Sequence, residues 1–307
     1  MPGILWLASY PKSGNTWMRA FLANLILDAS APLPLKRIGE VCPSEPAEMW
    51  FKPFTKGPVG DLTAKEVAEL RSQAQERAVS LNNNVVPMKT HSYFGEDCGH
   101  PIFSMKATFG AVYIIRDPRD VAVSAADHFG KTMDEMIATM ADPLATGMPM
   151  PGIIVHELQS SWSNHVESWT KWNHPGIFVV RYEDLLADPA GHLREIFAWM
   201  DIDPSAELCD RVAEETRIGK LQQASTAGTA WDLEKEPQGF FRKGKADAWK
   251  EDLSAREIAV VEAIAGPLMD ELGYRRETPG MSWRQAFEIR AREGLARRLA
   301  SLAVKLQ

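Results

Sequence analysis

The chain has 307 residues, of which 45% are hydrophobic and 24% are charged. This composition suits one large globular domain or two small ones with an ample core. The formal net charge of -7 disfavours a nucleic-acid-binding protein, which would more often be basic, so any bound anion needs a local basic pocket.

The cysteines and the N-terminal segment indicate the cellular compartment in which the protein is expected. Cys42, Cys98 and Cys209 show no metal or redox spacing, so we expect reduced, buried thiols. The start of the chain lacks the basic and long apolar regions of a signal peptide. No apolar run reaches the roughly 18 residues of a membrane-spanning helix. We therefore expect a cytoplasmic protein.

The first predicted elements are a strand, a tight loop and a helix. Residues 4–8 form an apolar run long enough for a buried parallel strand. After the loop, Trp17, Ala20 and Phe21 recur at helical spacing.

The loop between these elements carries Lys12, Ser13, Gly14 and Thr16. Such a loop directs backbone N–H groups to one point, and the helix N-terminus adds partial positive charge. The pattern indicates a phosphate cradle; the alternative is an ordinary turn with a solvated lysine. The loop is not a Walker A motif, because Lys12 precedes Gly14 and the residue after Gly14 is Asn15.

The next segments are a long loop and a helix. Residues 30–60 are rich in Pro and Gly and contain three aromatic side chains, Trp50, Phe51 and Phe54. We expect either a functional lid or a loop that covers the core with these rings. Thr63 followed by Glu66 predicts a capping box that opens a helix over residues 63–80.

Two further apolar runs, residues 85–88 and 111–115, end in polar side chains. The first is followed by Lys89-Thr90-His91. The second is followed by Arg116 and then by a helix that Pro118 opens. Open α/β sheets bind ligands at the carboxyl ends of their strands, so both ends are candidate sites. Alternatively, Arg116 pairs on the surface with Asp117 or Asp120.

The middle of the chain suggests pocket and core segments. Residues 130–156 are rich in Met, Pro and Gly, which favours either an acceptor lid or a core-covering segment that contains a helix over residues 132–141. A helix over residues 157–173 carries three tryptophans, Trp162, Trp169 and Trp172, at a spacing typical of core packing.

The remaining predicted elements are a fourth strand over residues 177–180 and four helices. The helices cover residues 189–200, 204–216, 254–272 (capped by Ser254 and Glu257) and 282–307, the last being Arg-rich. A polar segment, residues 225–247, separates the second from the third and is expected to be flexible. It contains Arg242-Lys243-Gly244-Lys245, whose cations around a glycine could enclose a phosphate.

Taken in order, these motifs resemble those of the sulfotransferases that use 3′-phosphoadenosine 5′-phosphosulfate (PAPS). The matching segments are Pro11-Lys12-Ser13-Gly14-Asn15-Thr16-Trp17, Lys89-Thr90-His91, Arg116 with Ser124, Tyr182-Glu183-Asp184-Leu185, Thr216, and Arg242-Lys243-Gly244. The family usually has Thr where Asn15 stands, and a phenylalanine where Ile218 stands. The family's dimer motif is matched only at Lys250, which leaves the oligomeric state open.

The resemblance implies a single domain over residues 1–307, with the C-terminal helix as a peripheral extension. Its fold would be α/β, a central parallel sheet flanked by helices as in P-loop nucleotide kinases. The implied reaction moves a sulfonate group from PAPS to a hydroxyl or amine of a small acceptor, without a metal. The acceptor would be an apolar alcohol, a phenol or a lipid-like molecule. A P-loop-like kinase and a non-catalytic nucleotide-binding module are the alternatives.

The resemblance also implies roles for individual residues. His91 would be the general base, with Lys12 and Lys89 neutralising charge. Donor binding would fall to the following residues: Lys12, Ser13, Gly14, Asn15, Thr16, Trp17, Arg116, Ser124, Tyr182, Thr216, Arg242, Lys243 and Gly244.

Overall fold

The computed structural model describes residues 2–147, 149–171, 176–226, 244–280 and 284. The chain divides into two compact units. The first comprises residues 1–116 and 142–246, and the second comprises residues 117–141 and 247–307.

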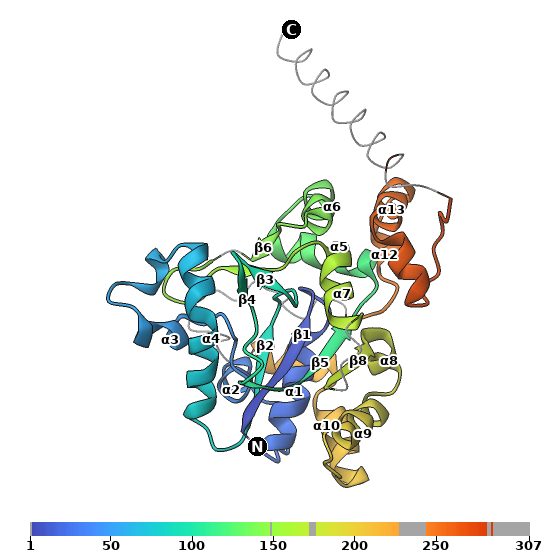
Figure 1. The fold of residues 1–307 in the computed structure, drawn as a ribbon. Coiled ribbons are helices and arrows are strands. Elements are labelled where there is room, and N and C mark those ends of the chain that lie inside the picture. The colour runs from blue at the N-terminus through green and yellow to red at the C-terminus, as the bar shows by residue number, and fades with distance from the viewer. Residues whose placement is uncertain (1, 148, 172–175, 227–243, 281–283, 285–307) are drawn as a thin grey trace. The chain divides into compact units, whose positions relative to one another are not determined.

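The first unit is built on a four-stranded parallel sheet in the order β2-β1-β5-β8 (Figure 1). The strands are β1 (Gly3–Ser9), β2 (Val85–Thr90), β5 (Thr108–Ile115) and β8 (Ile177–Arg181). All seven residues of β1 are buried, because parallel sheets in α/β folds are covered on both faces. Each predicted strand is confirmed, with ends that differ by at most three residues.

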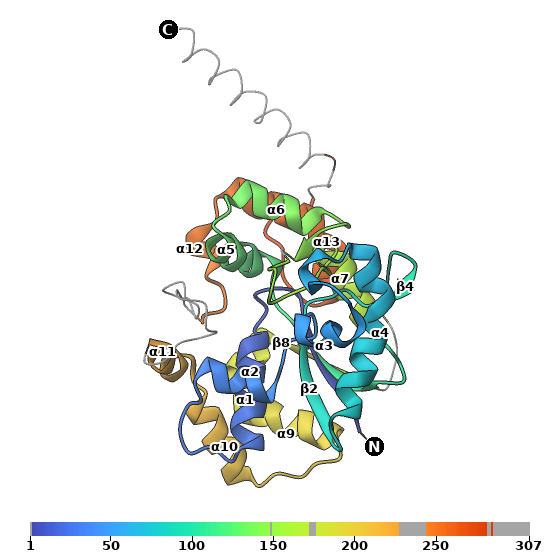
Figure 2. The ribbon, with the colours of Figure 1, turned by 90° about the vertical axis from the view of Figure 1, so that its left-hand side faces the viewer.

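One face of this sheet packs against α1 (Asn15–Ile26), α9 (Pro189–Trp199) and α10 (Ala206–Glu215). Their shared core includes Leu5, Leu7, Phe21, Val112, Ile114, Leu193 and Val212. In Figure 2, α1 lies beside α10 and beside α2 (Leu35–Val41).

The other face is covered by aromatic side chains. Trp6 of β1 contacts Phe103 edge-on, and Tyr113 of β5 stacks on Trp169 of α7 (Trp162–Thr170). The predicted core role of Trp162 and Trp169 is thus confirmed, whereas Trp172 lies outside the described residues.

The predicted helix over residues 157–173 begins too early. Residues 157–158 form β7 (Glu157–Leu158), which pairs with β6 (Thr146–Gly147). The helix starts only at Trp162 because the hydroxyl of Ser161 caps the N–H of Asn164.

Residues 30–60 are not one long loop. They contain α2, α3 (Glu48–Phe51) and two short 3₁₀ turns, η1 (Lys52–Phe54) and η2 (Val59–Asp61). Trp50 and Phe51 are buried, so these two rings cover the core rather than line an exposed lid.

The first unit has further elements. They are α4 (Ala64–Ser80), with the predicted capping box, β3 (Glu96–Asp97), β4 (His100–Pro101), α8 (Tyr182–Ala187) and α11 (Ile218–Thr226).

The second unit is helical in its described part. It contains α5 (Pro118–Phe129), α6 (Met133–Ala141), α12 (Trp249–Asp252) and α13 (Ala255–Glu271). The predicted capping box of Ser254 and Glu257 opens α13. Met136 and Met140 of α6 are buried, which favours the core-covering interpretation for this helix. The predicted helix over residues 282–307 lies almost wholly outside the described residues.

Candidate active site

The turn between β1 and α1 has the backbone of an anion cradle. Lys12 has a φ of 67° and Gly14 a φ of 105°, which turn the chain sharply at the helix N-terminus. The first-turn N–H groups of Asn15 and Thr16 have no acceptor among the described residues. Unsatisfied N–H groups at a helix start favour a bound anion.

Two side chains of this turn support the same interpretation. The Ser13 hydroxyl is only 1% exposed and has no hydrogen-bond partner in the described part of the chain. A buried hydroxyl without a partner is costly, and a phosphate oxygen would satisfy it. Asn15 instead donates to the Leu7 carbonyl at 2.7 Å, so it ties the turn to β1.

Gly14 is required by its neighbour as well as by its φ. A Cβ at this position would lie 2.6 Å from the ring of Tyr182 at the start of α8. The Tyr182 ring therefore covers the cradle at van der Waals distance, and the sequence resemblance had placed both residues at the nucleotide.

Arg116, at the end of β5, connects the cradle to two other predicted segments. Its guanidinium donates to the Lys12 carbonyl at 2.9 Å and to the Lys245 carbonyl at 3.2 Å. It also lies 4.5 Å from the centre of the Tyr182 ring, a cation–π contact. Arg116 is 9% exposed, so it does not lie on the surface as the alternative interpretation assumed.

Trp17 and Thr216 meet beside Tyr182. The Trp17 indole donates to the Thr216 carbonyl at 2.8 Å, and its ring lies 5.7 Å from that of Tyr182. The Thr216 hydroxyl donates to the Val212 carbonyl at 2.6 Å within its own helix. Thr216 is therefore brought to the site, but its hydroxyl is already engaged.

The predicted residues of the polar segment are only partly described. Gly244 has a φ of 58°, and a Cβ there would lie 2.4 Å from Ile218. Arg242 and Lys243 lie outside the described residues. The contact between Arg116 and Lys245 still places the end of this segment at the cradle.

Ser124 belongs to the second unit, where it is partly buried on α5.

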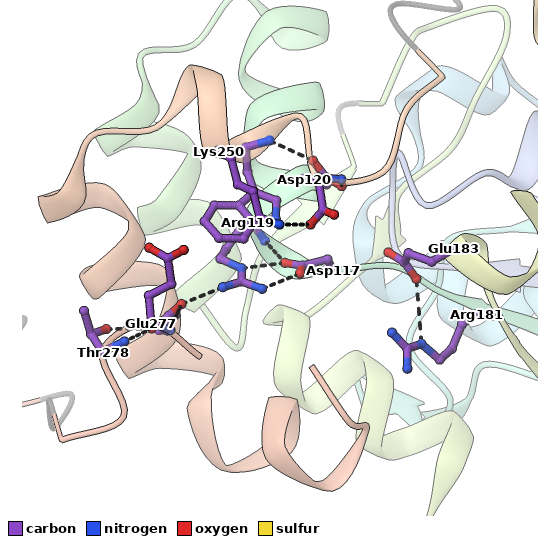
Figure 3. A network of polar contacts seen from close by, with 11 residues as sticks. Asp117, Arg119, Asp120, Arg181, Glu183, Lys250, Glu277 and Thr278 are labelled. Atoms are coloured by element: carbon purple, nitrogen blue, oxygen red, sulfur yellow. Dashed lines mark hydrogen bonds and ion pairs between the residues drawn. The ribbon is translucent and has the colours of Figure 1, made fainter. Parts of the chain in front are cut away.

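The second unit also holds a buried network of ion pairs and hydrogen bonds that sequence reasoning missed (Figure 3). Arg119 forms ion pairs with Asp117 and Glu262, both at 2.6 Å, and stacks 3.7 Å from the centre of the Trp249 ring. Asp120 accepts hydrogen bonds from the N–H groups of Asp247 and Trp249.

The end of β2 presents Lys89 and His91. Nδ1 of His91 donates to the Ser9 carbonyl at 2.7 Å, because a carbonyl can only accept. The proton is thereby placed on Nδ1, and the lone pair is on Nε2, which has no hydrogen-bond partner among the described residues. Nε2 of His91 can therefore accept a proton.

Electrostatics keep this histidine neutral. Burial lowers the pKa of His91 well below its usual value, and the nearby charge of Lys89 lowers it further. Burial also lowers the pKa of Lys89. A neutral imidazole at pH 7 can accept a proton, as a general base must.

Three functional neighbours of His91 were missed. Glu157 accepts from the His91 N–H at 2.7 Å, and His165 donates through Nε2 to the His91 carbonyl at 3.1 Å. Tyr113 in turn donates to Nδ1 of His165 at 2.8 Å. Burial lowers the pKa of His165 to about 3. All three act on the main chain or on each other, which no local motif reveals.

Metal sites and membrane-spanning helices are two further features to consider in the described residues. No group of three or more His, Cys, Asp or Glu side chains gathers there as a metal site would require. Nor does any helix in those ranges have the length and apolar character needed to cross a membrane.

Comparison with known proteins gives consistent results. Residues 2–273 match the family model described as "Sulfotransferase domain". Mouse Sulfotransferase 1B1 is 22% identical over 284 residues, covering 86% of this chain and 81% of the relative. Human Sulfotransferase 1E1 is 24% identical over 271 residues, covering 81% and 78%. Cytosolic sulfotransferase 10 of Arabidopsis thaliana is 22% identical over 278 residues, covering 84% and 75%.

Solved structures show the same fold. Mouse sulfotransferase SULT7A1 complexed with PAP superposes with a TM-score of 0.58 at 19% identity, covering 88% of this chain and 86% of the other. Retinol dehydratase in a complex with retinol and PAP superposes with a TM-score of 0.57 at 19% identity, covering 88% and 82%. The predicted α/β fold with a P-loop-like central sheet is confirmed.

Proposed function

The chain belongs to the sulfotransferase domain family, and we propose that it transfers a sulfonate group from PAPS to a hydroxyl or amine of a small acceptor. The family makes it an enzyme of the transferase class. The single observation that carries the choice of donor is the cradle at residues 12–16, where open N–H groups surround the buried, unpartnered hydroxyl of Ser13. These groups fit a 5′-phosphosulfate.

The donor would be held by the residues around this cradle. Ser13, Gly14, Asn15 and Thr16 would bind its 5′ end, and Lys12 would neutralise charge there. Trp17 and Tyr182 would flank the adenine, whose ring stacks on aromatic faces. Arg116 would contact the 3′-phosphate, as would Gly244, Arg242 and Lys243. Ser124 keeps the same assignment from the resemblance alone.

The transfer itself would need a base and a positive charge. Nε2 of His91 would take the proton of the acceptor hydroxyl while its oxygen forms a bond to sulfur. The bond between sulfur and the phosphate oxygen breaks, and 3′-phosphoadenosine 5′-phosphate (PAP) leaves with the electron pair. Lys12 and Lys89 would stabilise the charge on the bridging and sulfonate oxygens, so this proposal assigns no metal.

The acceptor class rests on relatives. Two retinol dehydratase structures hold androsterone and retinol, both largely apolar alcohols. We propose an apolar alcohol, phenol or lipid-like acceptor for this chain as well. We also propose a cytoplasmic location, since one relative is named cytosolic.

We further propose that the two compact units form one sulfotransferase domain. The family match runs without interruption from residue 2 to residue 273 and so draws on both units.

The test is a transfer assay with radiolabelled PAPS and, separately, labelled ATP, each with and without Mg²⁺. We expect sulfonate transfer to a panel of phenols and alcohols without Mg²⁺, and none from ATP. Transfer from ATP that requires Mg²⁺ would favour a kinase, and binding of PAP without any transfer would favour a nucleotide-binding module.

A further inference from the structure

A carboxylate lies against the main chain of His91. Glu157 is the first residue of β7, and its Oε1 accepts the His91 N–H at 2.7 Å. The two residues are 66 positions apart in the chain. Glu157 is only 4% exposed, so its charge has been taken out of water, which is costly unless something compensates.

No ion pair within the described residues compensates this charge. No Lys, Arg or His there lies within ion-pair distance of Glu157. The other buried carboxylate of this region, Glu45, is satisfied: it pairs with Arg71 at 2.6 Å and accepts from Gln75 at 3.0 Å. In the described part of the chain, the side chain of Glu157 accepts only the His91 N–H.

The charge of Glu157 acts on Lys89, two residues before His91 in the chain. Glu157 is the largest influence that raises the pKa of Lys89, against burial and the charge of Arg19, and Glu45 acts in the same sense more weakly. His91, two residues further along the chain, is influenced by Lys89, His165 and Arg19. One carboxylate thus acts on the side chain of Lys89 and on the main chain of His91, both assigned to the transfer step.

We propose that Glu157 is a positioning residue of the transfer reaction, which holds the main chain at His91 with one carboxylate oxygen and stabilises the positive charge of Lys89 with its own negative charge. The inference rests on the proposed function, in which Lys89 must carry a positive charge and His91 must be neutral. Without Glu157, Lys89 would lose its proton at lower pH, and the His91 N–H would be buried without a partner.

The decisive variant is Glu157→Gln. Its side-chain carbonyl can still accept the His91 N–H, so only the charge is lost. We expect the alkaline limb of the kcat–pH profile to move to lower pH by about one unit, the size typical of an opposite charge near an ionisable group. PAP affinity measured by calorimetry should change less than twofold. Glu157→Ala should lose at least about tenfold in kcat at the optimal pH.

A second readout does not depend on activity. Acetylation of Lys89 by acetic anhydride, followed by peptide mass spectrometry across a pH series, reports the fraction of neutral amine. We expect the midpoint for Lys89 to move down by about one pH unit in Glu157→Gln. The matched control is Glu96→Gln, an exposed acid on β3, which should leave the profile and the midpoint unchanged.

The proposal would be overturned if Glu157→Gln left both the alkaline limb of the kcat–pH profile and the acetylation midpoint of Lys89 unchanged. So would a Glu157→Ala variant with near-normal kcat, or a Glu157→Gln variant that loses PAP affinity and thermal stability together, as a purely structural role predicts. Failure of the proposed function is a separate result, because the unmodified chain would then transfer no sulfonate while the Lys89 midpoint could still move.

Discussion

Replacing Gly14 by alanine tests the cradle most directly. A residue with a Cβ at a φ of 105° is strained by about 1–2 kcal/mol. The new methyl would also lie 2.6 Å from the Tyr182 ring, and that ring is confined between Arg116 and Trp17. Overpacking of this kind costs about 1–3 kcal/mol. We therefore expect Gly14→Ala to lower the free energy of unfolding by about 2–5 kcal/mol.

The matched control separates the two costs. Gly130, the C-cap of α5, has a φ of 61°, and a Cβ there would meet nothing within 4 Å. Gly130→Ala should therefore cost only the backbone strain, about 1–2 kcal/mol. Urea unfolding measures both variants, and calorimetric titration with PAP should show at least about a tenfold loss for Gly14→Ala alone, since a shift of about 1.4 kcal/mol is tenfold. Equal unfolding costs with unchanged PAP affinity would refute the contact between Tyr182 and the cradle.

The remaining predictions concern the base, the guanidinium and acid stability. His91→Ala should lower kcat by about 10²–10⁴-fold and leave PAP affinity nearly unchanged; near-normal turnover at saturating acceptor would assign the base elsewhere. Arg116→Ala should weaken PAP binding by roughly 10- to 100-fold, the value of a lost charge-assisted hydrogen bond, and AMP binding less, as calorimetry with both nucleotides would measure; equal losses would contradict a 3′-phosphate contact. The pKa of His165 is about 3 in the folded chain against a usual 6.5. Below pH 6.5 this residue therefore binds more protons in the unfolded chain than in the folded one. The free energy of unfolding should fall as the pH is lowered, by up to about 1.4 kcal/mol per pH unit. Urea midpoints from pH 7 to pH 5 should fall less steeply for His165→Gln, and identical slopes would contradict a neutral, buried His165.

Sequence reasoning found the strands and the polar residues at their carboxyl ends because both follow from local patterns. Residues 4–8, 85–88, 111–115 and 177–180 are short apolar runs that stop at polar residues, as strands of a buried parallel sheet do. The glycine and lysine of the cradle have positive φ values, which match the tight turn expected between a strand and a helix.

The features that were missed depend on contacts between distant segments. Glu157 is one acidic residue in a segment rich in Met, Pro and Gly, and its partner is a main-chain N–H 66 residues away. Arg119 and Glu262 are 143 residues apart. The sequence left open whether Trp50 and Phe51 belong to a lid or cover the core, because a loop's burial depends on what packs against it. In the structure both rings are buried. The late start of α7 was, by contrast, readable from Ser161 and its N-cap position.

Several side chains of the candidate site donate hydrogen bonds to main-chain carbonyls of other site residues. In such a pair, the accepting residue contributes its backbone to the fold and keeps its side chain for chemistry. Arg116 binds the Lys12 carbonyl, His91 binds the Ser9 carbonyl, and Trp17 binds the Thr216 carbonyl. Each contact survives a substitution of the accepting residue's side chain, so the chemistry-bearing side chains can change without moving their partners. The carbonyl of Lys12 accepts the hydrogen bond from Arg116, and its side chain takes no part in that bond. A substitution of Lys12 should accordingly alter turnover far more than it alters the position of the guanidinium, whereas a substitution of Arg116 affects the cradle, Tyr182 and Lys245 together.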